Sequence, residues 1–89
     1  MMRIHRGYLD GPQGQLHYRR CGDGRPLLLL HQSPISSAQF IAVLPRLAER
    51  GFAAFALDLP GFGNSDPPSL PASLNAYADA ANAALDHCG

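Results

Sequence analysis

The sequence contains no tryptophan and no lysine, so all seven of its basic residues are arginine. Seven acidic residues balance them, and the formal net charge is zero. A neutral chain lacks the basic surface that captures nucleic acid or anionic lipid. We therefore expect neither nucleic acid nor a membrane surface among its partners.

The chain also lacks a long apolar run and has little cysteine. Its longest run, Leu27–Leu30, is far shorter than the roughly 20 residues that span a bilayer. The charged start, Met1–Arg6, is not followed by the apolar stretch of a secretory signal. Cys21 and Cys88 are too few for a disulfide framework and favour free thiols in a reducing compartment. These absences predict a cytoplasmic protein.

The length of 89 residues allows one small domain or one part of a larger domain. The first 21 residues predict an antiparallel hairpin, with strands at 3–10 and 15–21 around the turn Gly11–Gly14. Alternation in the second strand places Leu16 and Tyr18 on one face and His17 and Arg19 on the other.

The remainder alternates between strand and helix signals. Two apolar runs, Pro26–His31 and Phe52–Leu57, are typical of parallel strands buried on both faces. Between them we expect a capping serine at 36–37, a loose turn and a helix over Leu44–Arg50. A last helix capped by Ser73 and ended by Gly89 has an apolar stripe formed by Leu74, Tyr77, Ala78, Ala81 and Leu85. A hairpin followed by β-α-β-α predicts an α/β fold with parallel strands.

Two loops that follow the apolar strands carry a resemblance. The stretch Leu27–Pro34, LLLLHQSP, resembles the strand and HGxP loop of the α/β-hydrolase fold family. The stretch Asp58–Asp66, DLPGFGNSD, resembles the D-x-x-G-x-G-x-S-D loop of the same family. One helix and one strand separate the two motifs, as in the family, and the resemblance covers nearly the whole chain.

The resemblance implies roles for these loops. In the family, the residue before the proline contributes one backbone N–H to the oxyanion hole, and here that residue is Ser33. Gln32 stands where the family often has glycine, and its amide can reach into the same pocket. The resemblance gives structural roles to the other motif residues, which are His31, Pro34, Asp58, Gly61, Gly63, Ser65 and Asp66.

The catalytic triad of the family is absent from the sequence. The nucleophile of the family lies on a sharp turn such as G-x-S-x-G, and no such motif is present. We therefore interpret residues 1–89 as the N-terminal portion of an α/β-hydrolase domain, truncated before the nucleophile and inactive alone. An intact parent would hydrolyse an ester or related bond of a small molecule without a cofactor. The substrate, the nucleophile type (Ser, Asp or Cys) and the oligomeric state stay open, as does the choice between a truncated chain, a split gene and a pseudogene product.

Other interpretations of single motifs are weaker. Gly61-x-Gly63 is not a dinucleotide fingerprint, because two prolines follow and prevent a helix from starting there. His5 and His17 lack further metal ligands, so we expect surface histidines and no metal site. Asp58 and Asp66 could form a carboxylate pair, although hydrogen bonding of Asp58 to its own loop is the simpler role.

A second hypothesis belongs to a different class. In the family order the Pro26–His31 strand is central, yet the sequence supplies no neighbour for its outer side. An apolar open edge favours pairing with another strand. The alternative function is therefore a non-catalytic module that pairs this edge with a partner chain or with a second copy.

Overall fold

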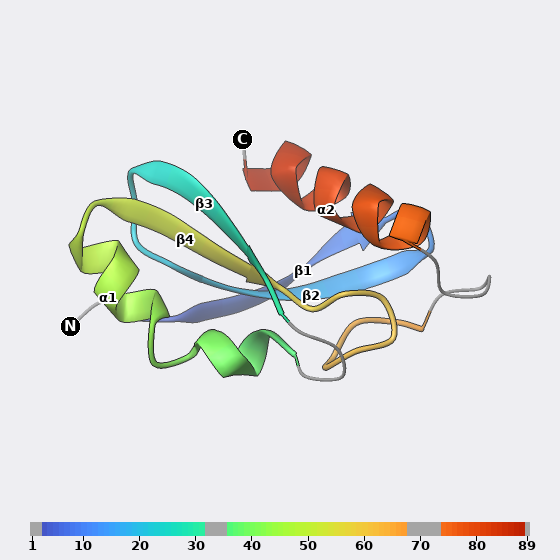
Figure 1. Ribbon diagram of the computed structural model, residues 1–89, viewed down its shortest axis with the longest axis horizontal. Coiled ribbons are helices and arrows are strands. Elements are labelled where there is room, and N and C mark those ends of the chain that lie inside the picture. Colours follow the sequence, from blue (N-terminus) through green and yellow to red (C-terminus); the bar gives the residue numbers. More distant parts are fainter. Residues whose placement is uncertain (1–2, 32–35, 68–73, 89) are drawn as a thin grey trace.

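Three strands open the described chain, and helices and strands alternate after the third. The computed structural model describes residues 3–31, 36–67 and 74–88. The expected helix ends Ser73 and Gly89 fall outside these ranges. The elements in chain order are β1 (His5–Gly11), β2 (Gly14–Cys21), β3 (Arg25–Leu30), the 3-10 helix η1 (Ser37–Phe40), α1 (Leu44–Glu49), β4 (Phe52–Leu57) and α2 (Leu74–Cys88) (Figure 1).

The strands form one mixed sheet in the order β1-β2-β4-β3. The hairpin strands β1 and β2 pair antiparallel, and β2 pairs antiparallel with β4. Only β3 and β4 run parallel, in a register that places Leu30 opposite Leu57. Both parallel strands therefore end at the same edge of the sheet, and the loops that follow them start side by side.

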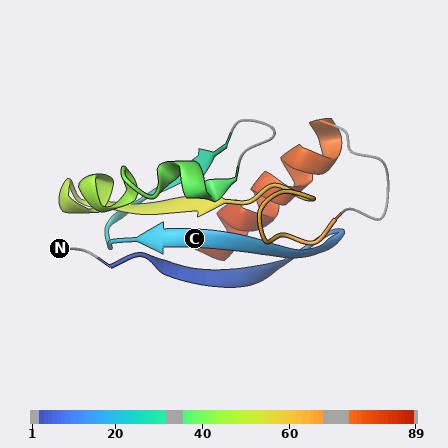
Figure 2. The same cartoon turned by 90° about the horizontal axis from the view of Figure 1, so that it is seen from below.

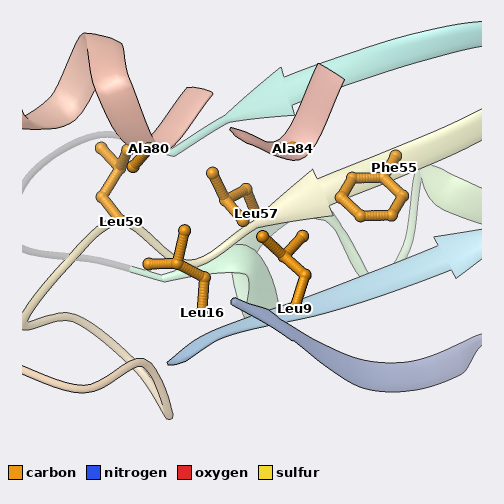
Figure 3. Packing of buried hydrophobic residues seen from close by; sticks show 7 residues of the cluster. All are labelled: Leu9, Leu16, Phe55, Leu57, Leu59, Ala80 and Ala84. Atoms are coloured by element: carbon orange, nitrogen blue, oxygen red, sulfur yellow. The ribbon is translucent and has the colours of Figure 1, made fainter. Parts of the chain in front are cut away.

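The two faces of the sheet are buried by different helices. Along β4, side chains alternate between the faces. Ala54 and Ala56 pack on the α1 side, in a cluster with Cys21, Leu44 and Ala48. The opposite face is covered by α2 (Figure 2). The larger cluster lies there and is made of Leu9, Leu16, Phe55, Leu57, Leu59, Ala80 and Ala84 (Figure 3).

The segment between β3 and β4 matches its expectation closely. Ser36 accepts a hydrogen bond from the backbone N–H of Ala38 and caps η1. The regular helix α1 starts at Leu44, as expected, and ends one residue early, at Glu49. Pro45 lies in the first turn of α1, where a missing N–H removes no helical hydrogen bond.

The expected apolar stripe of α2 is wrong at Ala78 and Leu85, whereas Tyr77 packs against the core as expected. Its buried positions within the described side chains are Ala76, Ala80 and Ala84, whereas Ala78 is exposed and Leu85 is 49% exposed. An alanine row spaced by four lets the helix backbone approach a sheet that already carries large side chains. The large side chains at this contact come from the strands, so the larger apolar residues of the helix did not predict which helix face is buried.

The expectation that β3 is buried on both faces is also wrong. Leu27, Leu28 and Leu29 are half-buried, and Leu30 is 47% exposed. The reason is topological, because within the described residues β3 is an edge strand with β4 on one side only.

Candidate active-site loops

The candidate site lies where β3 and β4 end. His31 follows β3 directly and Asp58 follows β4 directly, and in open α/β sheets this carboxyl edge is where ligands bind. Of the residues singled out from the sequence, Gln32, Ser33 and Pro34 lie outside the described residues. The other six are described, and two of them, His31 and Asp58, connect the two loops through hydrogen bonds with Leu59 and Ser37.

Both ends of the segment after β3 are attached to the loop after β4. At its start, Nε2 of His31 accepts a hydrogen bond of 3.0 Å from the backbone N–H of Leu59. At its C-terminal end, the backbone N–H of Ser37 donates to Oδ1 of Asp58 over 2.6 Å. The two anchor points, Asp58 and Leu59, are adjacent in sequence. His31 and Ser37, which flank the HGxP-like segment, are therefore both bonded to adjacent residues of the second motif.

Asp58 is the centre of these contacts. Its side chain is fully buried, and besides Ser37 it accepts hydrogen bonds at Oδ2 from the backbone N–H of Asn64 (3.0 Å) and from Nδ1 of His17 (2.8 Å). Burial by itself raises the pKa of Asp58, but the hydrogen bonds from Ser37, Asn64 and His17 outweigh burial and lower that pKa below its ordinary 3.8. Asp58 is therefore a carboxylate at neutral pH.

His17 is not the surface histidine that we expected. It is 2% exposed, and its ring meets that of Tyr8 edge-on, whereas His5 is exposed on β1. No metal-binding cluster of three or more His, Cys, Asp or Glu is found among the described residues. The alternation of β2 did place His17 on the face away from Leu16. The sequence offered no sign that a loop 41 positions away covers that face.

Ser65 completes a buried group of serine, histidine and aspartate, yet the geometry is not that of a catalytic triad. Its hydroxyl donates to the backbone carbonyl of Asp58 over 2.6 Å and accepts from the backbone N–H of His17 over 2.8 Å. A hydroxyl has one hydrogen, and here the main chain takes it. Ser65 therefore serves as a structural bridge between β2 and the loop, not as a nucleophile.

The rest of the second motif shapes the loop and attaches it to the hairpin. Gly63 has φ +53°, and a Cβ there would collide with the Asp58 carboxylate. Gly61, at φ +83°, donates to the backbone carbonyl of Asp66 over 3.0 Å. Asp66 exchanges two bonds of 2.9 Å with the backbone of Gln15, through its own N–H and its Oδ2. Asp58 and Asp66 thus bind different partners.

Comparisons with known proteins identify the family of the chain. Residues 25–89 match the family model described as alpha/beta hydrolase fold. A haloalkane dehalogenase of Mycobacterium marinum is 42% identical over 62 residues, which cover 67% of this chain and 21% of the relative. A soluble epoxide hydrolase of Corynebacterium sp. (strain C12) is 34% identical over 85 residues, covering 96% of this chain and 29% of the relative.

The solved structures agree on the fold. A haloalkane dehalogenase loop variant from Bradyrhizobium elkanii superposes with a TM-score of 0.89 at 29% identity, covering 98% of this chain and 29% of that one. The chain thus spans less than a third of the length of each of these three proteins.

Proposed function

Because this chain belongs to the alpha/beta hydrolase fold family, we propose that it is the N-terminal part of a hydrolase domain and supplies the oxyanion loop. The observation that carries the proposal is the double attachment of the segment between His31 and Ser37 to Asp58 and Leu59. An oxyanion hole needs backbone donors held in place before charge develops, and such donors stabilise the transition state most when they are rigid. The backbone N–H of Ser33 is the proposed donor, with the Gln32 amide beside it.

The nucleophile, the acid and the catalytic histidine of the proposed enzyme come from outside these 89 residues. Asp58 and Ser65 are committed to hydrogen bonds with the protein itself, and Nε2 of His31 is occupied by the Leu59 N–H. We therefore propose that the chain has no hydrolytic activity alone. A chromogenic ester assay tests this directly, because turnover above buffer that is lost in a Ser65→Ala or His31→Ala variant would contradict the proposal.

The proposed substrate is a small molecule with a bond cleaved by water, and no cofactor takes part. The names of the relatives point to haloalkanes and epoxides as substrates of those proteins, and we extend only the hydrolytic class to this chain. Within the described residues, no helix is long and apolar enough to cross a membrane. We propose a cytoplasmic location for the enzyme.

A chimera tests the contribution to the active site. The matching segment of the Corynebacterium epoxide hydrolase is replaced by these 89 residues, and epoxide hydrolysis is measured. Ser33→Pro, which removes the proposed donor N–H, should lower kcat about 100- to 1000-fold. Ser33→Ala keeps the N–H and is the matched control. A folded chimera in which both variants turn over equally fast would contradict the oxyanion role.

The alternative, a module that pairs its sheet edge, is favoured by one observation. β3 is an edge strand in the described sheet and ends in the 47% exposed Leu30. For this alternative we propose pairing with a second copy of the chain. Light scattering after size exclusion should then show a dimer that Leu30→Lys disrupts, while Leu85→Lys, at a 49% exposed position on α2, does not. A monomer at all concentrations would count against it.

A further inference from the structure

We propose that His17 is a positioning residue: its imidazole holds the Asp58 carboxylate in the orientation that fixes Ser37, and so sets the end of the loop that starts at His31. The catalytic meaning of this role rests on the proposed function, whereas the positioning itself does not. His17 belongs to neither of the two motifs that carry the family resemblance.

The first step is that His17 itself is held firmly. Its backbone carbonyl accepts the N–H of Asp58 over 2.9 Å, and its own N–H donates to Ser65 Oγ over 2.8 Å. Tyr8 covers the ring, with the two ring centroids 5.3 Å apart. The backbone of His17 is therefore held on both sides, and its buried imidazole reaches Asp58 from a restrained main chain.

The second step concerns the direction of the hydrogen bond. A carboxylate only accepts hydrogen bonds, so Nδ1 of His17 must carry the hydrogen that points to Asp58 Oδ2. Charge-assisted bonds of this kind are short and strongly directional. Oδ2 also accepts from Asn64, while Oδ1 accepts from Ser37. Each oxygen thus has its own donors, and rotation of the carboxylate would break bonds on both sides.

The third step is that β2 restrains Ser37 twice. Arg19 lies two positions after His17, on the same face of the strand. Its guanidinium donates to Ser37 Oγ, while His17 acts on the Ser37 N–H through Asp58. Ser37 is fully buried and begins η1. One strand face therefore positions the residue at which the chain returns from the candidate oxyanion segment.

The experiment compares two amide replacements of the imidazole in the 89-residue chain. In His17→Asn, the side-chain NH₂ takes the place of Nδ1–H and can donate to Asp58. In His17→Gln, the longer amide reaches past that position. His17→Leu removes the donor altogether. The measurement is the ¹⁵N–¹H spectrum with hydrogen exchange of the Ser37 amide. The amide of Asp58, which is bonded to the His17 carbonyl just beyond the β2–β4 pairing, reports an intact fold.

We expect exchange of the Ser37 amide to accelerate about tenfold in His17→Gln and His17→Leu, the factor that loss of one net hydrogen bond of about 1.4 kcal/mol gives. His17→Asn should restore it to within about threefold. If His17→Leu fails to fold, the Asn and Gln variants carry the comparison. Equal exchange of the Ser37 amide in Asn and Gln variants with an intact Asp58 amide would overturn the proposal.

This test is independent of catalysis. The exchange rates need no turnover, whereas the oxyanion role depends on the Ser33→Pro chimera. A positive exchange result with an unaffected Ser33→Pro chimera would retain the positioning role and reject the proposed function.

Discussion

His17 and Asp58 are joined in three ways although 41 positions separate them in sequence. Asp58 N–H donates to the His17 carbonyl, the imidazole Nδ1 lies 2.8 Å from Oδ2, and Ser65 bridges the main chains of both residues. Backbone and side chains thus reinforce one another at a single point between β2 and the loop after β4. The stability of the candidate site should depend strongly on this point.

Asp58→Asn should destabilise the fold by about 1–3 kcal/mol. The variant keeps one oxygen acceptor for Ser37, but its NH₂ group faces the N–H of Asn64 and leaves a buried donor without an acceptor. Urea unfolding followed by circular dichroism measures the change. Asp66→Asn, at an exposed carboxylate, is the matched control and should cost less. Equal losses in the two variants would show that burial of Asp58 is unimportant.

The free energy of unfolding should decrease as the pH is lowered through the range in which Asp58 takes up a proton. Because the folded-state pKa of Asp58 is lowered below 3.8, the unfolded chain binds its proton more readily. The contribution of Asp58 is therefore fully present above the ordinary pKa and is lost as the pH falls from there through the lower folded-state value. Urea midpoints of the parent chain should drop more steeply below pH 4 than those of Asp58→Asn. Parallel slopes would contradict the lowered pKa.

Gly63→Ala should be more damaging than Gly51→Ala. Both glycines have positive φ, at +53° and +92°, so each substitution carries a backbone penalty of about 1–2 kcal/mol. A Cβ at Gly51 meets no atom within 4 Å, whereas a Cβ at Gly63 collides with the Asp58 carboxylate. The difference in free energy of unfolding isolates the collision. Equal losses would mean that the carboxylate can move aside freely.

The packing of α2 predicts that two alanine-to-leucine substitutions differ strongly in their cost to stability. Ala80→Leu, at a position 1% exposed against the sheet, should cost about 1–3 kcal/mol through overpacking. Ala78→Leu, at an exposed position of the same helix, should change stability by less than about 0.5 kcal/mol. Thermal unfolding of both variants provides the comparison. A larger loss in Ala78→Leu than in Ala80→Leu would instead support the helix face expected from the sequence.

The fold class could be predicted from the sequence because strand and helix signals are local. The turn Gly11–Gly14, the apolar runs and Pro45 each act on neighbouring residues, and they placed the described elements within a residue or two. Burial is different, since it depends on what covers a face. The apolar run of β3 predicted burial on both faces, although the family order had already implied an open outer side for this strand. Alanine in α2 gave no sign of close packing.

The same distinction between local and long-range signals applies to the residues of the candidate site. Asp58 and Gly63 could be singled out because the motif has fixed local spacing. His17, Arg19 and Ser37 could not, because their contacts with the site span 41, 18 and 21 positions. A strand pattern assigns a residue to a face, but only the tertiary fold decides which distant loop lies over that face.

The strand order has a consequence for how the chain acquires its structure. Because β4 lies between β2 and β3 in the sheet, neither of its neighbours can complete its pairing until residue 57 is available. Ser65 and Asp66 then bind positions near residue 16 on the hairpin, across 48 and 51 positions. Such distant closures give a high contact order and slow folding. During synthesis the first hairpin should therefore remain only partly structured until the Asp58–Asp66 loop has left the ribosome.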